Sequence, residues 1–69
     1  MRKYLVVYEK AGRNYSAFCP DLPGCAATGA TKKEVERNIK AAIALHLEGL
    51  KQDRLSPPAQ TASAEYVSL

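Results

Sequence analysis

Two cysteines and one histidine are the residues of this chain best suited to nucleophilic or metal chemistry. A cysteine nucleophile needs a base and a third group that orients the base. His46 lies on the apolar stripe of a segment with helical periodicity, so we expect a packed core histidine instead of a base. Cys19, Cys25 and His46 offer three possible metal ligands, but the Cys-x5-Cys spacing is not typical of zinc sites. We therefore expect no cysteine catalysis, no metal and no cofactor.

The same two cysteines could form one disulfide bond. The N-terminal run is basic and then apolar, like a secretory signal, but it breaks at Glu9 and no small-residue cleavage site follows. No apolar run approaches the roughly 20 residues that cross a bilayer. These observations favour a cytoplasmic protein, where free thiols are the usual state. Whether Cys19 and Cys25 ever bridge stays open.

The carboxylates do not form a convincing nuclease site. Hydrolysis on two metal ions needs three or four carboxylates around the phosphate. Glu34 belongs to a predicted helix cap, and most other acids lie on a solvated helix face, which leaves Glu9 and Asp21. Two carboxylates cannot hold two metals, so we expect no enzymatic activity.

The chain is basic, with ten basic and seven acidic residues and a formal net charge of +3. Four basic residues gather at the start of the predicted helix: Lys32, Lys33, Arg37 and Lys40. Aromatic residues that could stack on bases are not interleaved with them. A solvated surface is the favoured interpretation, and a contact with nucleic acid or an acidic surface is the alternative.

The elements that position these residues follow from local patterns. Residues 3–8 and 15–19 are β-branched and aromatic, as strands prefer, and are joined by a Gly- and Asn-containing turn. A third strand is expected at 25–29, a helix from about 32 to about 52, and a last strand at 64–69. The order β-β-β-α-β predicts one α+β domain, residues 1–69, with three or four mainly antiparallel strands and one helix packed on one face.

The helix has a clear start signal. Thr31-Lys32-Lys33-Glu34 fits a capping box, in which Thr31 is the N-cap and Glu34 reaches back to the amide of Thr31. Apolar residues then recur at spacings of three and four from Val35 to Leu50. One helix can cover only one face of the sheet, yet the first strand is apolar on both faces. We therefore expect a partner, another copy or a different protein, on the second face.

Between the second and third predicted strands lies Pro-Asp-Leu-Pro-Gly-Cys, residues 20–25. Pro20 and Pro23 lack an amide hydrogen and must end the strand pairing. Asp21 can accept hydrogen bonds from backbone amides, and Gly24 allows a bend after Pro23.

This motif, followed at short distance by Gly-x-Thr, resembles the HicB antitoxin family. Tyr-Ser-Ala-Phe before it and the helical run 42–50 after it extend the resemblance over most of the chain. The resemblance implies a partial RNase H-like fold and an antitoxin of a type II toxin–antitoxin system. Such antitoxins bind a HicA-type mRNA interferase and occlude its active site, and they commonly form dimers or tetramers. Full-length members add a C-terminal DNA-binding domain; this chain stops at the predicted last strand, so direct DNA binding is not expected.

The resemblance gives the loop a binding role without catalysis. Asp21 would pair with a toxin Lys or Arg, Leu22 would fill a pocket, and Pro23 would stiffen the contact. Pro20 and Gly24 would shape the loop, and shaping alone is the favoured role for all three of Pro20, Pro23 and Gly24. Because the chain is itself positive, binding to a basic toxin would rest on shape and apolar burial more than on charge. The alternative function is a free-standing RNA- or ligand-binding module with the same fold and no toxin.

Overall fold

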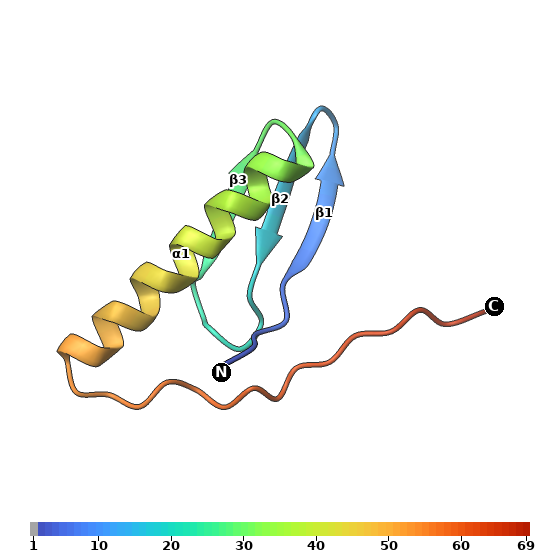
Figure 1. Ribbon diagram of the computed structural model, residues 1–69. Coiled ribbons are helices and arrows are strands. Elements are labelled where there is room, and N and C mark those ends of the chain that lie inside the picture. Colours follow the sequence, from blue (N-terminus) through green and yellow to red (C-terminus); the bar gives the residue numbers. More distant parts are fainter. Residues whose placement is uncertain (1) are drawn as a thin grey trace.

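A computed structural model describes residues 2–69, and Met1 lies outside that range. Three strands, β1 (Val7–Ala11), β2 (Asn14–Phe18) and β3 (Ala26–Gly29), precede one helix, α1 (Lys32–Gln52). The strands form an antiparallel sheet in the order β1-β2-β3, and α1 crosses one of its faces (Figure 1). The predicted α+β class, with one helix on one face of an antiparallel sheet, is confirmed.

The β1–β2 turn contains two residues, Gly12 and Arg13, with Ala11 opposite Asn14. Gly12 has φ 60°, and the positive φ in this turn is confined to it. A positive φ at the first central position alone is typical of a type II′ turn, which favours glycine there and matches the twist of the strands. Asn14, which we expected within the turn, is instead the first residue of β2.

The first strand pairs later in the chain than the predicted range 3–8. Val7 is opposite Phe18, and the ladder does not continue toward the N-terminus. The amide of Cys19 instead donates to the carbonyl oxygen of Cys25, at 3.0 Å. Pro20 has no amide to offer, so residues 4–6 run on without pairing to β2.

The core lies between the sheet and α1. Its fully buried members come from the helix and the loop before β3, namely Val35, Ile39 and Leu22, while Ala17 contributes from β2. Tyr8 and Tyr15 pack against this cluster on the same side. The opposite face is apolar at one end only, where Val7, Phe18 and Ala26 are neighbours across the strands. Phe18 remains 40% exposed there.

Both ends of α1 match known capping patterns, and its bounds agree with the prediction. Thr31 has extended backbone, and its hydroxyl accepts from the amide of Glu34 at 3.1 Å. The helix ends in a Schellman motif: Leu55 donates to the carbonyl of Leu50 at 2.8 Å, and Arg54 donates to that of Lys51 at 3.0 Å. Arg54 takes the left-handed conformation, φ 57°, that glycine usually supplies at this position.

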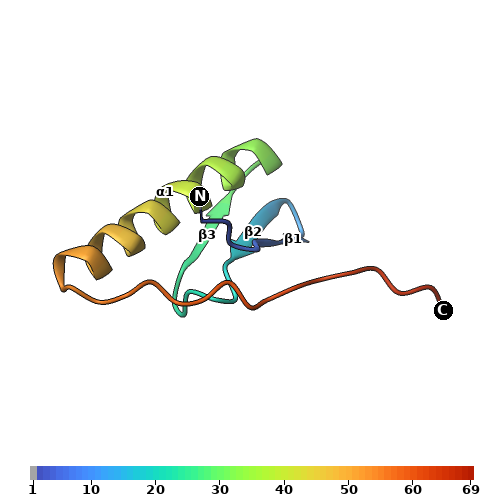
Figure 2. The ribbon, with the colours of Figure 1, turned by 60° about the horizontal axis from the view of Figure 1, so that its bottom comes forward.

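The predicted last strand, residues 64–69, is not formed. After α1 the chain is extended, passes below the sheet and leaves it beyond β1 (Figures 1 and 2). Tyr66, Val67 and Leu69 are exposed, at 71% or more of their surface. A strand exists only when its backbone is paired, and this segment finds no pairing partner within residues 2–69.

Residues 2–69 contain no membrane-spanning helix: α1 has sufficient length, but it is too polar.

Candidate functional site

The PDLPGC loop is two consecutive β-turns. The amide of Leu22 donates to the carbonyl of Cys19 at 3.1 Å, and the amide of Cys25 donates to the carbonyl of Leu22 at 3.0 Å. Each proline is therefore the second residue of a four-residue turn, the position for which its fixed φ is best suited. Gly24 has φ 81°, as the third position of a type II turn requires. The shaping role predicted for both prolines and Gly24 has a direct backbone explanation.

Leu22 joins the two turns and is 0% exposed. Its side chain belongs to the core cluster with Val35 and Ile39. The interpretation of Leu22 as a residue that fills a partner's pocket does not agree with this placement, because the side chain has no surface to offer. Pro20 and Pro23, by contrast, are exposed on the outside of the loop.

Asp21 holds the C-terminal segment against this loop. Its carboxylate accepts from the hydroxyl of Thr61 at 2.9 Å, from the amide of Thr61 at 3.1 Å, and from the amide of Ala62 at 3.1 and 3.2 Å. The amide of Ala62, together with the hydroxyl and amide of Thr61, holds the pKa of Asp21 below its ordinary value despite the opposing effect of burial. Asp21 thus contacts its own chain, 40 residues away, at the position we predicted for a toxin contact.

Two more contacts fix the segment before Thr61. The hydroxyl of Tyr4 donates to the carbonyl of Pro58 at 2.8 Å, and the amide of Lys3 donates to the side-chain oxygen of Gln60 at 3.0 Å. The chain that follows α1 is therefore attached to the N-terminal segment and to the loop. A hollow of about 520 Å³ separates residues 5–8 from residues 64–66, with Lys32 at its margin.

Cys19 and Cys25 are free thiols with 3% and 6% of their surface exposed. Burial, and then the neighbouring Cys19, raise the pKa of Cys25. A buried thiol in apolar surroundings is a poor nucleophile, so both cysteines act as small apolar core residues. His46 is half-buried on α1. Across residues 2–69, no three His, Cys, Asp or Glu side chains come together in a set that could hold a metal.

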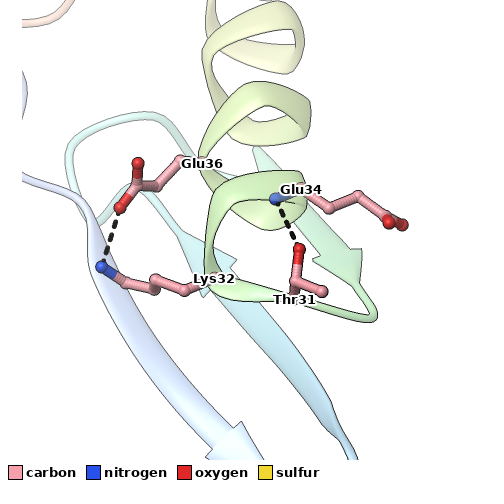
Figure 3. A network of polar contacts seen from close by, with 4 residues as sticks. All are labelled: Thr31, Lys32, Glu34 and Glu36. Atoms are coloured by element: carbon pink, nitrogen blue, oxygen red, sulfur yellow. Dashed lines mark hydrogen bonds and ion pairs between the residues drawn. The ribbon is translucent and has the colours of Figure 1, made fainter.

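The start of α1 carries a local polar network (Figure 3). Lys32 is paired with Glu36 at 2.9 Å and lies over the ring of Tyr8 at 4.2 Å. The bond with Glu36 raises the pKa of Lys32 and lowers that of Glu36. The capping box predicts that the carboxylate of Glu34 accepts from the amide of Thr31, but this bond is not formed. The carboxylate instead accepts from the amide of Ala30, at 3.4 Å. Half of the predicted box is present, and Thr31 is the cap.

Lys32 is therefore an exposed, ion-paired residue instead of a free cation. The other three basic residues, Lys33, Arg37 and Lys40, are exposed. Their spacing of four and three places them on one side of α1.

Residues 4–68 match the family described as HicB-like antitoxin of bacterial toxin-antitoxin system. The chain belongs to the HicB-like antitoxin family. This match covers the PDLPGC loop, the helix and the segment held by Asp21 in a single stretch.

Three curated relatives show how the HicB-like chain compares in length. It is 41% identical over 61 residues to a UPF0150 protein of Thermoplasma acidophilum, covering 87% of this chain and 88% of that protein. It is 36% identical over 67 residues to a UPF0150 protein of Synechocystis, covering 96% and 85%. It is 34% identical over 65 residues to an uncharacterized 14.9 kDa protein of Haemophilus phage HP1, covering 94% of this chain but 49% of the phage protein. No solved structure matches the chain.

In the HicB-like chain, the residues of the PDLPGC loop are placed differently from what the sequence indicated. Sequence reasoning assigned Asp21, Leu22 and Pro23 to one contact surface, but only Pro23 is exposed there. It missed the attachment of Thr61 and Ala62 to Asp21, for which no local signal exists. A signal for Leu22 did exist, because a single large apolar residue between two turn-forming prolines is well placed to point inward.

Proposed function

We propose that this HicB-like antitoxin neutralises a HicA-type ribonuclease toxin in the cytoplasm by covering the toxin's active site, with no catalysis of its own. The observation that carries the proposal is the family match over residues 4–68, almost the whole chain. Both cysteines are buried, so neither offers an exposed nucleophile. Direct DNA binding is not part of the proposal.

The PDLPGC loop is the surface we propose for the toxin contact. Pro20 and Pro23 are exposed on two turns that are closed by three backbone hydrogen bonds. A loop that is already ordered loses little conformational entropy when it docks. Pro23 would then be the direct contact, Leu22 would hold the loop from the inside, and Asp21 would reach a toxin cation only by releasing Thr61 and Ala62.

Co-expression tests the proposal. The chain is expressed with a short basic toxin encoded at the same locus, and growth and co-purification are measured. Rescue of growth together with a stable complex is the expected result. Persistent arrest with no complex would show the proposal to be wrong.

A pair of variants tests the loop separately. Pro23→Arg adds bulk and positive charge on the exposed loop. Arginine can adopt the φ of about −60° that the second position of this turn requires, so the fold should be kept. Gln52→Arg adds the same charge at the far end of α1. We expect Pro23→Arg to weaken the complex and Gln52→Arg to leave it intact. Equal binding by both variants would exclude the loop as the contact.

A second function, binding of RNA without any toxin, is supported by the exposed row Lys33, Arg37 and Lys40. It predicts a salt-dependent mobility shift of RNA by the purified chain. Loss of that shift in a Lys33→Ala, Arg37→Ala, Lys40→Ala variant would support it, and no shift at low salt would exclude it.

A further inference from the structure

Residues 63–69, here called the tail segment, are extended chain whose backbone is not paired with any strand. Within residues 2–69, no hydrogen bond joins the tail segment to the rest of the chain. Tyr66, Val67 and Leu69 are exposed at 105%, 71% and 120%. An extended segment with an unpaired backbone and three large exposed apolar side chains is suited to add as a strand to the edge of another sheet.

The same chain carries a matching acceptor. β1 is an outer strand of the sheet, so one of its edges faces no other strand. Ala11 and Asn14 flank the two-residue turn, and hydrogen-bonded pairs alternate from there along an antiparallel ladder. By this alternation we expect Tyr8 and Lys10 to direct their backbone groups outward, to the free edge. Val7 and Phe18 provide apolar surface next to that edge.

The tail segment does not pair with the edge of its own molecule. Asp21 fixes Thr61 and Ala62 at the PDLPGC loop, and residues 64–66 then face residues 5–8 across a hollow of about 520 Å³. It continues away from the sheet in both views instead of turning along the strand (Figures 1 and 2). Seven extended residues span about 23 Å, which exceeds the roughly 17 Å of the five-residue β1. The segment is thus long enough to cover a full strand on another molecule.

We propose that two copies of this chain exchange their tail segments, each lying along the β1 edge of the other. A chain that carries both an unpaired extended segment and an unpaired sheet edge is self-complementary, which is what a two-fold symmetric dimer requires. The exchange would pair the backbone of residues 63–69, extend each sheet to four strands, and bring Val67 or Tyr66 onto the apolar end of the open face. This deepens the self-association expected of the family but does not depend on toxin binding.

Sedimentation of the purified full chain over a range of concentrations tests the exchange. Wild type should form a dimer, and Val67→Pro should weaken that dimer about tenfold or more, because the lost amide and the steric conflict occur twice in a symmetric exchange. Leu45→Lys is the matched control: it removes a side chain that is 75% exposed on α1 and should leave the dimer unchanged. Helix content by circular dichroism should be the same in all three proteins.

Cross-linking distinguishes exchange from pairing within one chain. A chain with Glu9→Cys on β1 is mixed with a second chain bearing Ser68→Cys, while the native cysteines are buried. A short thiol cross-linker should join the two different chains, and the Tyr8 and Lys10 amides should become protected from hydrogen exchange as concentration rises. A monomer at all concentrations, a Val67→Pro dimer as tight as wild type, or cross-linking only within a doubly substituted chain would each overturn the proposal.

Discussion

Gly29 of β3 lies against the first turn of α1, and an alanine there should be costly. A Cβ at this position would lie 2.6 Å from the amide nitrogen of Val35, 3.0 Å from its Cα and 3.1 Å from the carbonyl carbon of Glu34. All three atoms are backbone atoms in the first turn of the helix, so no side-chain rotation can relieve the contact. The helix must move away from β3, where Asn38 donates to the carbonyl of Thr28 at 2.8 Å.

Overpacking of this kind typically costs about 1–3 kcal/mol. We expect Gly29→Ala to reach the upper part of that range, because Val35 and Ile39, both 0% exposed, would move with the helix. Gly49→Ala is the internal control. No atom lies within 4 Å of its added Cβ, so the exchange should stabilise the helix by about 1 kcal/mol.

Urea unfolding at one fixed protein concentration measures both variants, since self-association would otherwise shift the midpoint. The urea concentration at the midpoint of unfolding should be lower than wild type for Gly29→Ala and higher for Gly49→Ala. The dependence of the unfolding free energy on urea concentration should be unchanged in both. Thermal unfolding should separate them in the same order, at about 4–8 °C per kcal/mol for a domain of this size. A Gly29→Ala protein as stable as wild type would refute the argument that the glycine is required for close packing.

Three further outcomes follow from single contacts. Because the pKa of Asp21 is lowered in the folded chain, its contribution is present above the ordinary value of 3.8 and is lost as the pH falls through the lower folded pKa. The protection of the Ala62 amide from hydrogen exchange, taken relative to an unprotected amide at the same pH, should therefore fall on acidification below that value, and Asp21→Asn should reduce this protection at neutral pH and abolish the acid step. Thr31→Ala removes the N-cap bond to Glu34 and should lower the unfolding free energy by about 1 kcal/mol in urea titration; no change would mean that another group caps α1. Arg54→Gly relieves the left-handed conformation at the helix end and should raise the melting temperature, by the equivalent of at most about 1 kcal/mol; a lower melting temperature would mean that the arginine side chain makes a stabilising contact.

The parts of the fold that were predictable depend on neighbours in sequence. The helix bounds followed from Thr31 and the three-and-four spacing, and the hairpin followed from Gly12. The last strand and the role of Asp21 were not predictable in this way. Both depend on what lies opposite a residue in space, and the bond from Asp21 to Thr61 joins positions 40 apart in the chain. Leu22 was expected on the surface because its neighbours Asp21, Pro23 and Gly24 are typical of an exposed loop, whereas a side chain between two tight turns can still point inward.

Asp21 has a wider consequence, because it lies between the surface we propose for the toxin and the segment we propose to be held by a second copy. A toxin docked on Pro23 and a second copy holding the tail segment would both act on the joint formed by Asp21 with Thr61 and Ala62. If docking at one surface loosens or tightens that joint, the affinity at the other must change by the same factor. The carboxylate of Asp21 would then couple binding at the PDLPGC loop to binding of the tail segment.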